Sequence, residues 1–245
     1  TVTSLPLRPP ENLQAPEKPV YATQDGSTLD VVEVFPTIQG EGPYAGRPAV
    51  FVRLAGCNLR CPGCDTNYTA GRAPTDTIHL ARKVLELFPY KSTGIVRPLV
   101  VLTGGEPLRQ PVGPFVRLLN ETGFGVQVET NGTIYQEDFP WYGPNVVVCS
   151  PKTGTINELL RFHVKDLKYV LRAGAVDEAD GLPTSILGQG APARPWGRFT
   201  GTVWVQPEDE GDKEKNEANT EAAVQSAMKY GYRFGVQLHK WIGMP

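Results

Sequence analysis

The segment Gly56-Cys57-Asn58-Leu59-Arg60-Cys61-Pro62-Gly63-Cys64-Asp65-Thr66 holds three of the four cysteines of the chain and directly follows an apolar run, residues 48–55. That run predicts a buried strand, which brings the cysteines to one end of a sheet. Thiolates four and three residues apart can point inward from a tight loop, as a metal ion or an iron–sulfur cluster requires. The fourth ligand is missing, because Cys149 lies in the apolar run 146–149 and is expected to be a small buried residue. One metal position is then open to a substrate or cofactor.

Two other interpretations of this cysteine loop stay open on spacing alone. A zinc ion completed by a water molecule could use the same three thiolates, and a disulfide would leave one thiol spare. The disulfide is disfavoured, because the sequence shows no secretory leader and four cysteines in 245 residues are not a secreted disulfide scaffold. We therefore expect a cytoplasmic protein.

Composition excludes several classes of function. The net charge is −2 and no basic stripe is present, so no nucleic-acid partner is expected. No apolar run approaches the roughly 18 residues of a membrane span, so no membrane partner is expected. The length suits one domain, which we place at residues 29–245. Residues 1–28 form an N-terminal extension whose Pro-rich part, 1–24, is expected to wrap the surface or to be mobile.

Hydrophobic patterning predicts alternating strands and helices. An Asp25-Gly26 turn followed by a β-branched run predicts a small hairpin or an edge strand within residues 22–35. Further strands are predicted at 48–55, 98–103, 125–132, 145–149, 163–171, 202–205 and 232–239, and helices at 74–88, 111–120, 155–162 and 219–229. The first helix is expected to bury Ile78, Ala81, Val84, Leu85 and Phe88. Residues 173–198 are expected to form an excursion over one face, and residues 208–215 an acidic loop.

Polar motifs follow the predicted strands, and this common position is the strongest argument for the fold. Strands that alternate with helices form a parallel sheet, and sites in such folds are built where the strands end. About six to seven βα units are fewer than the eight of a closed barrel. We therefore predict an α/β fold, a partial, open TIM-like β/α barrel. The motifs at its strand ends are the cysteine loop, Gly104-Gly105-Glu106-Pro107, Glu129-Thr130-Asn131-Gly132, Ser150-Pro151-Lys152, Gln206-Pro207 and His239.

The spacing Cys-x-x-x-Cys-x-x-Cys resembles the signature of the radical S-adenosylmethionine (SAM) superfamily. With the strand-end motifs, the segment 35–42 (Phe-Pro-Thr-Ile-Gln-Gly-Glu-Gly) and the tail His239-Lys240-Trp241-Ile242-Gly243-Met244-Pro245, the chain resembles the 7-carboxy-7-deazaguanine synthase family. The resemblance covers about residues 29–245 but leaves 173–198 unmatched. It implies that Cys57, Cys61 and Cys64 hold a 4Fe-4S cluster and that SAM binds the open iron.

The resemblance also implies roles for individual residues. Taken alone, each glycine-rich motif is as well explained by an ordinary turn, Arg53 by a structural arginine, Lys152 by a solvated cation, and Asp65-Thr66 by a cap. Thr66 would be the protein ligand of a Mg²⁺ ion. The residues implied to bind SAM are Gly104, Gly105, Glu106, Glu129, Asn131, Ser150, Lys152 and Gln206. Those implied to bind the substrate are Ile38, Gln39, Gly40, Glu41, Arg53, Thr103, His239 and the terminal carboxylate of Pro245.

The implied reaction is a ring contraction. A reduced cluster would cleave SAM to a 5′-deoxyadenosyl radical, which abstracts hydrogen from C6 of 6-carboxy-5,6,7,8-tetrahydropterin. Rearrangement and loss of ammonia would then give 7-carboxy-7-deazaguanine for queuosine or another 7-deazapurine, which makes the enzyme a lyase. The implied partners are a flavodoxin or ferredoxin as electron donor and a second copy of the chain in a homodimer.

One residue departs from the resembled pattern, and two rival functions share part of it. The residue before the third cysteine is usually aromatic in the superfamily and packs on the adenine of SAM, but here it is Gly63. The adenine would need another support, such as Tyr68 or the region of Gln206. A radical SAM activase of a glycyl-radical protein would share the cysteine loop and Gly104–Pro107. A non-enzymatic zinc or iron–sulfur module would need the cysteine loop alone.

Overall fold

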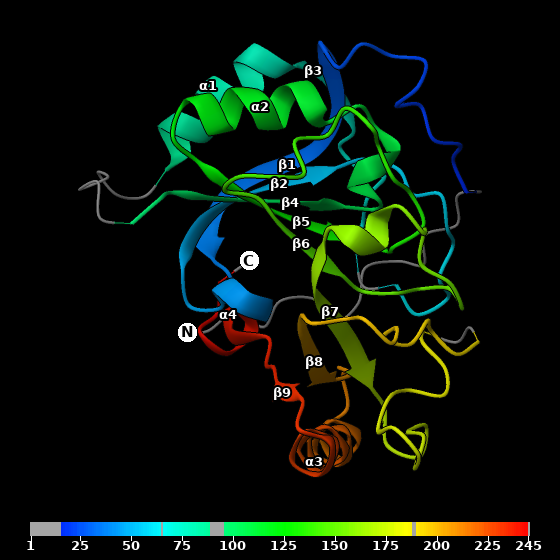
Figure 1. Ribbon diagram of the computed structural model, residues 1–245. Coiled ribbons are helices and arrows are strands. Elements are labelled where there is room, and N and C mark those ends of the chain that lie inside the picture. Colours follow the sequence, from blue (N-terminus) through cyan, green and yellow to red (C-terminus); the bar gives the residue numbers. More distant parts are fainter. Residues whose placement is uncertain (1–15, 65, 89–95, 188–189, 245) are drawn as a thin grey trace.

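The computed structural model describes residues 16–64, 66–88, 96–187 and 190–244. Its centre is one nine-stranded sheet with the strand order β3-β1-β2-β4-β5-β6-β7-β8-β9, which curves and stays open (Figure 1). Neighbouring strands from β2 to β9 run parallel, whereas β1 is antiparallel to both β2 and β3. The predicted partial, open β/α barrel is therefore confirmed. The expectation of a wholly parallel sheet is wrong for its first two strands.

The strands form where apolar residues recur, and their alternation separates two faces of the sheet. Val50, Val52 and Leu54 of β2 lie in the main hydrophobic core, as do Val126 and Val128 of β5. Residues between them point to the other face, since side chains alternate along a strand. The strands are β1 (Thr28–Ile38), β2 (Pro48–Leu54), β3 (Ala73–Asp76), β4 (Leu99–Gly104), β5 (Gly125–Thr130), β6 (Val146–Cys149), β7 (Val164–Leu171), β8 (Thr202–Pro207) and β9 (Arg233–Phe234).

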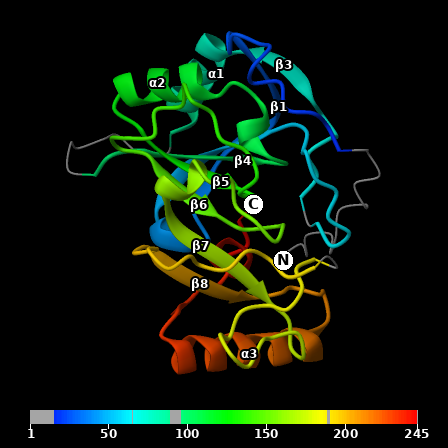
Figure 2. The same ribbon diagram turned by 45° about the vertical axis from the view of Figure 1, so that its right-hand side comes forward.

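Helices cover the outer, core-bearing face of the sheet at its two ends. The helices α1 (Thr77–Leu87) and α2 (Gly113–Glu121) lie over the first strands, and α3 (Lys213–Tyr230) packs on β8 and β9 (Figures 1 and 2). The short helix α4 (Leu238–Trp241) and the 3-10 helix η1 (Gly42–Tyr44) lie on the inner side, against β1 and β7 respectively. Two further 3-10 helices are η2 (Pro107–Arg109) and η3 (Leu160–Phe162). The inner face is thus closed by loops and by the C-terminal segment.

Register places side chains from distant parts of the sequence on the inner face. Arg53 of β2 lies beside Thr103 of β4, and Glu129 of β5 lies beside Val148 of β6. Lys168 of β7 has Trp204 of β8 as its neighbour. Each of these residues alternates with a core residue on its own strand, so polar groups face the interior of the partial barrel.

Several predicted elements have different bounds in the structure. Residues 73–76 form the edge strand β3 rather than the start of a helix, and α1 begins after Asp76, whose carboxylate caps the amides of Ile78 and His79. Residues 22–27 form turns, and the strand that follows lies between two others, so neither the hairpin nor the edge position was right. The predicted helix 155–162 is reduced to η3. The helix predicted at 219–229 begins earlier, at Lys213 behind the cap Asp212, and shortens the expected acidic loop.

The predicted final strand, 232–239, is wrong over most of its length. Only Arg233 and Phe234 pair with β8, and the chain then turns into α4, which carries His239. The tail was expected to be packed down by Trp241, but this side chain is 89% exposed. Among described residues 173–187 and 190–198, one isolated bridge, Val176 to Pro183, is the regular structure in the excursion. Residues 1–15 of the extension and Pro245 lie outside the described residues.

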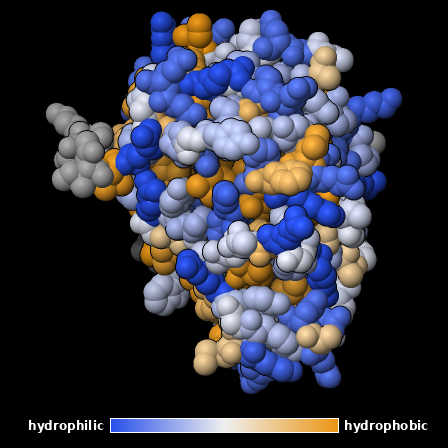
Figure 3. Space-filling model, in the orientation of Figure 1, coloured by the Kyte–Doolittle hydropathy of each residue, from blue (hydrophilic) through white to orange (hydrophobic). Residues whose placement is uncertain are grey.

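The surface in the orientation of Figure 1 is mainly hydrophilic, with separate apolar patches between charged side chains (Figure 3). Burial agrees for Cys149, whose prediction as a small core residue is confirmed by complete burial. No helix in the described ranges is both long and apolar enough to cross a membrane.

The apolar face of α1 supplies a matched pair of substitutions. Leu80 is 1% exposed, whereas Ile78, which was predicted to be buried, is 55% exposed. We expect Leu80→Ala to lower the free energy of unfolding by about 2–5 kcal/mol, because it leaves a cavity between helix and sheet. Ile78→Ala should cost less than about 1 kcal/mol. Urea denaturation followed by circular dichroism measures both, and equal losses would contradict this assignment of the buried face.

Candidate active site

The cysteine loop begins where β2 ends and carries three free thiols. Cys57 is buried, and Cys61 and Cys64 are half-buried. The Cys57 sulfur accepts a hydrogen bond from the backbone amide of Leu59 at 3.4 Å and a longer one from Asn131 Nδ2 at 3.9 Å. Hydrogen bonds to cysteine sulfur are one of the means by which proteins stabilise and tune iron–sulfur clusters.

The three thiols lie close enough to influence one another electrostatically. Burial raises the pKa of Cys57 to about 12, the Leu59 amide opposes this, and the charges of Glu106, Cys61 and Cys64 add to the increase. In the described part of the chain, no three His, Cys, Asp or Glu side chains are grouped to hold a single metal ion. Each cysteine of a cluster binds a different iron, so their sulfurs need not converge on one point. The donor set therefore fits a cluster that supplies the positive charge these buried thiolates lack.

The loop after β4 passes directly against the cysteine loop. A Cβ on Gly104, whose φ is +136°, would lie 2.1 Å from the carbonyl oxygen of Leu54. A Cβ on Gly105 would lie 2.2 Å from the carbonyl oxygen of Gly56 and 2.8 Å from Cβ of Cys57. Both positions require glycine, because the two backbones touch. This contact brings Gly104 and Gly105, predicted SAM contacts, to the cysteine loop.

Glu106 is fully buried and joins three strand ends. Its Oε1 accepts from the Leu108 amide at 3.0 Å and from the Thr130 hydroxyl at 2.9 Å. Its Oε2 accepts from the same hydroxyl at 3.0 Å and from the Asn131 amide at 2.7 Å. Burial raises its pKa to about 7, although these hydrogen bonds and the charge of Lys152 act in the opposite direction. The chain's own donors occupy the roughly four acceptor positions of a carboxylate, so the predicted contact of Glu106 with SAM stays a prediction.

Asn131 links β5 to the cysteine loop. Its side chain is buried and donates to Asn58 Oδ1 at 3.0 Å, while its own Oδ1 accepts from the Thr133 amide and hydroxyl at 3.0 and 2.6 Å. Asn58 in turn donates to the Thr133 hydroxyl at 2.8 Å. Next along the edge, Lys152 Nζ lies 2.6 Å from Ser150 Oγ. Lys152 is half-buried, so it is not the freely solvated cation considered from the sequence.

Lys168 is the centre of a buried polar cluster on the inner face. Its ammonium group contacts Glu41 Oε2 and lies 3.3 Å from Glu129 Oε2. Lys168 is 7% exposed. Burial lowers the pKa of a lysine, but the charges of Glu129 and Glu41 raise that of Lys168 above its ordinary value. Three charged groups from η1, β5 and β7 are therefore held together where the barrel interior is closed.

Three glutamine side chains surround these carboxylates. Gln39 donates to Glu129 Oε1 at 3.1 Å, and Gln237 donates to Glu41 Oε1 at 2.8 Å. Gln206, predicted to lie near the adenine of SAM, also donates to Glu41, at 3.3 Å. Burial alone would raise the pKa of Glu41, but the charge and hydrogen bond of Lys168 lower it to about 2. Glu41 is therefore an ionised acceptor at neutral pH, and Gln206 lies among predicted substrate residues.

The C-terminal segment reaches this cluster through His239. A Cβ on Gly40 would lie 1.9 Å from His239 Nδ1, so only glycine leaves room for the imidazole. The Leu238 amide also donates to the Gly40 carbonyl at 3.1 Å. Burial lowers the pKa of His239, while the charge of Glu41 raises it. The structure thus brings together four residues predicted for the substrate: Gln39, Gly40, Glu41 and His239.

Other predicted residues lie apart from the cluster or are not placed. Arg53, the predicted clamp for a substrate carboxylate, pairs with Glu33 at 2.5 Å, and Thr103 lies beside it in the sheet. Ile38 is the last residue of β1. The Thr66 carbonyl oxygen accepts from Cys64 Sγ at 3.7 Å.

Gly63 contacts a residue of the excursion. Its amide donates to the Leu187 carbonyl at 3.2 Å, and a Cβ there would lie 3.4 Å from Leu187 Cδ2. A methyl group would fit at ordinary contact distance, but an aromatic ring would collide. Tyr68, suggested as an alternative support for adenine, is 4% exposed and packed away.

Sequence reasoning missed Lys168 and Gln237. Lys168 stands in Val164-Lys165-Asp166-Leu167-Lys168-Tyr169, where alternation of polar and apolar residues predicts a solvent-exposed polar face. In a partial barrel the second face is the interior, so the predicted fold could have directed attention to this lysine. Gln237 carried no comparable signal, because the strand expected there is absent.

The fold and the cysteine loop define a class of protein, the radical SAM superfamily, whose family model matches residues 52–172. A 7-carboxy-7-deazaguanine synthase from Rhodospirillum rubrum is 44% identical over 224 residues, which cover 88% of this chain and 92% of the relative. A second, from Rickettsia prowazekii, is 38% identical over 229 residues, 90% of each chain. The chain belongs to the 7-carboxy-7-deazaguanine synthase family.

A solved structure supports the fold independently. QueE from Escherichia coli superposes with a TM-score of 0.65 at 21% identity, covering 88% of this chain and 96% of that chain. Membership of the family makes the chain a radical SAM enzyme, with a 4Fe-4S cluster and SAM as cofactors, a small-molecule substrate and an external source of electrons. The interpretations as a glycyl-radical activase or as a non-enzymatic metal module are superseded by these relatives.

Lys168 yields a test of the buried cluster. We expect Lys168→Met to lower the free energy of unfolding at pH 7 by about 3–5 kcal/mol, because Glu41 and Glu129 lose their buried counter-charge. The loss should shrink at lower pH: without Lys168, burial raises the pKa of Glu41 above its usual 4.5, and the carboxyl takes up a proton in the folded state.

The matched control is Lys165→Met on the same strand, where the side chain is exposed. This variant should stay within about 0.5 kcal/mol of the unaltered chain. Urea denaturation at pH 5 and pH 7 compares the two. A pH-independent loss in Lys168→Met, or one matched by Lys165→Met, would remove the ion cluster as the cause.

Proposed function

We propose that the chain converts 6-carboxy-5,6,7,8-tetrahydropterin to 7-carboxy-7-deazaguanine, with ring contraction and loss of ammonia. The observation that carries this proposal is the buried Glu41–Lys168–Glu129 cluster, two residues along β5 from Asn131 and its contact with Cys57. A small polar ring system bound at this cluster would lie next to the cysteine loop, where the radical is generated. The names of the curated relatives support the same reaction.

The chemistry of the cluster suits the pyrimidine half of a pterin. Its edge presents adjacent N–H donors beside a carbonyl, and an ionised carboxylate accepts two such donors at once. Lys168 and burial together hold Glu41 ionised in a site poor in water. Gln39 and Gln206 can turn an amide N–H or carbonyl toward the remaining ring atoms. In this proposal Lys168 keeps the acceptors charged and fixed in position.

The carboxylate of the substrate requires a separate cation. Arg53 lies on the same inner face and currently pairs with Glu33, whose side chain is 49% exposed. Because Glu33 is half-solvated, a substrate carboxylate can replace it as the bidentate partner of the guanidinium. His239 and the carboxylate of Pro245 are proposed to close the site from the tail.

The cofactors would be held around Cys57. When bound, the cluster and SAM supply the 5′-deoxyadenosyl radical that removes hydrogen from C6 of the pterin. Gly104 and Gly105 allow SAM to approach the cysteine loop, and Ser150 and Lys152 offer a hydroxyl and a cation for its ribose and carboxylate. Asn131 holds the cysteine loop in register with β5.

Thr66 is proposed as the protein ligand of a Mg²⁺ ion. The described residues show no carboxylate group arranged for an all-protein metal cage. Mg²⁺ keeps several waters and binds substrate oxygens readily, so a single hydroxyl beside the cysteine loop is a sufficient anchor. A flavodoxin or ferredoxin as donor, a homodimer and a cytoplasmic location complete the proposal.

The product assay tests the reaction directly. The anaerobically reconstituted enzyme with 6-carboxy-5,6,7,8-tetrahydropterin, SAM and dithionite should form 7-carboxy-7-deazaguanine, detected by mass spectrometry. A sample that lacks the pterin is the control for uncoupled cleavage of SAM. If 5′-deoxyadenosine appears with the pterin present but no deazaguanine forms, the substrate is wrong.

The Thr66 hydroxyl can be tested separately from SAM. We expect Thr66→Ala to weaken the dependence of turnover on added Mg²⁺ and to lower kcat/KM, because the metal loses its protein anchor. Thr66→Ser, which keeps the hydroxyl, should retain the metal response. SAM affinity, measured by calorimetry, should be unchanged in both variants. An unaltered Mg²⁺ response in Thr66→Ala would exclude this residue as a ligand.

A further inference from the structure

The N-terminal segment 16–21, which lies outside the family resemblance, runs along the start of the cysteine loop. The Glu17 amide donates to the carbonyl oxygen of Cys57 at 2.8 Å. The amides of Val20 and Tyr21 both donate to the carbonyl oxygen of Arg109, at 2.8 and 3.1 Å. The segment, called the strap below, is therefore attached to the cysteine loop at one end and to η2 at the other.

Side chains of the strap and of η2 form an ion pair beneath the loop. The Arg109 side chain is 2% exposed, and its Nη2 lies 3.2 Å from Glu17 Oε2. Its other contacts are backbone carbonyls, those of Lys18 at 3.1 Å and Ala55 at 3.4 Å. Among the described residues, Glu17 is the carboxylate with which Arg109 forms an ion pair. A buried guanidinium depends strongly on such a partner, because an uncompensated buried charge is costly.

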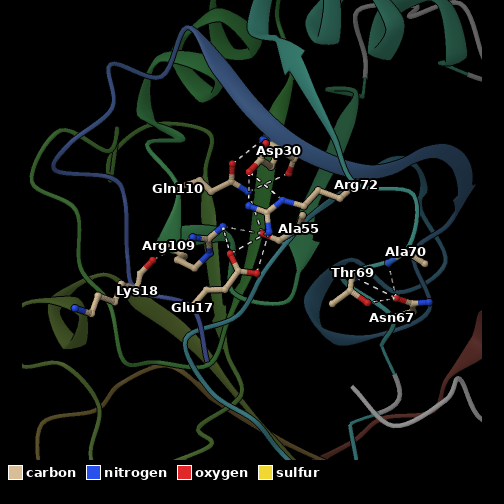
Figure 4. Close-up of polar contacts among 10 residues, drawn as sticks. All are labelled: Glu17, Lys18, Asp30, Ala55, Asn67, Thr69, Ala70, Arg72, Arg109 and Gln110. Atoms are coloured by element: carbon tan, nitrogen blue, oxygen red, sulfur yellow. Dashed lines mark hydrogen bonds and ion pairs between the residues drawn. The ribbon is translucent and has the colours of Figure 1, made fainter. Parts of the chain in front are cut away.

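The pair belongs to a larger network that encloses the residues before Cys57 (Figure 4). Arg72 donates to both oxygens of Glu17, at 2.9 and 3.0 Å, and also to Asp30 of β1. Gln110 accepts from the Asp30 amide at 2.7 Å and donates to the carbonyls of Asp30 and Ala55, at 3.0 and 3.1 Å. Glu17 thus connects the strap with β1, η2 and the segment after the cysteines.

The cysteine loop passes through a gap that this ion pair defines. Gly56 has a φ of +80°, and a Cβ there would lie 2.7 Å from Arg109 Nη2 and 2.8 Å from Glu17 Oε1. The backbone between Ala55 and Cys57 therefore rests directly on the two charged groups. Any shift of Glu17 or Arg109 is transmitted to Cys57 over one residue.

We propose that Glu17 is a positioning residue for the cluster ligand Cys57, and that it offsets the charge of Arg109 beside the cluster. The proposal rests on the radical SAM chemistry of the chain but not on the identity of its substrate. Without Glu17, the strap loses its ionic attachment and Arg109 becomes an uncompensated cation next to the cluster. Local charge is one of the quantities that set the potential of an iron–sulfur cluster.

Two measurements on the full chain test the proposal, with Glu17→Gln as the variant and Glu86→Gln on the exposed side of α1 as its control. Before reconstitution, the rate of alkylation of each cysteine is followed by mass spectrometry. Glu17→Gln should label Cys57 about tenfold faster or more, because a charge-assisted contact that resists local opening is lost. The buried Cys149 should react at its original rate. Equal acceleration at Cys57 and Cys149 would mean a general loss of stability and would overturn the proposal.

The second measurement is the midpoint potential of the reconstituted cluster, followed by electron paramagnetic resonance. Glu17→Gln should move it to a more positive value, since the reduced, more negative cluster is favoured by the bare charge of Arg109. The double variant Glu17→Gln, Arg109→Met should return it toward the original value, because both charges are gone. An unchanged potential in Glu17→Gln would refute the electrostatic role. A failed product assay with this potential shift present would concern the substrate alone.

Discussion

The buried carboxylate of Glu106 is the interaction on which the catalytic end of the sheet depends. Its backbone amide donates to Gly56 at 3.0 Å, and its side chain accepts from the loops after β4 and β5. A carboxylate in this position holds three parallel strand ends at a fixed distance, which a set of apolar contacts would not do with the same directionality. The cost is a buried acid whose pKa is raised to about 7. Glycines at 104 and 105 make the arrangement possible, because only they let the two backbones meet.

The interior of the partial barrel follows a different physical rule from the rest of the core. The outer face of the sheet is apolar and stabilises the fold by burial. The inner face holds Lys168 between two carboxylates, an arrangement that apolar residues of similar volume would often replace without loss of stability. Its value is therefore functional: a fixed, dry array of charged acceptors for a polar ring. The enzyme separates stability and recognition onto the two faces of a single sheet.

The strand ends could be predicted from the sequence because each central strand is a continuous apolar run followed by polar residues. The edges could not. Residues 73–76 have no apolar alternation, and β3 forms because β1 offers free backbone groups to pair with. The tail was wrong for a similar reason: residues 232–239 alternate like a strand, but Gly235 and the contact of Leu238 with Gly40 turn the chain inward. Tertiary contacts decided both segments, and local patterning carries no information about them.

The two segments that lie outside the family resemblance meet at the same place. Glu17 of the strap contacts Cys57 from one side, and Leu187 of the excursion contacts Gly63 from the other. Gly63 thus has a steric explanation: an aromatic residue there would occupy the space that Leu187 fills. The residues around the substrate cluster come from motifs shared with the resembled family, whereas the packing around the cysteine loop is supplied by segments particular to this chain. Such segments can alter the exposure and electrostatics of the cluster while leaving the substrate cluster unchanged, because the two regions are connected chiefly through the rigid end of β5.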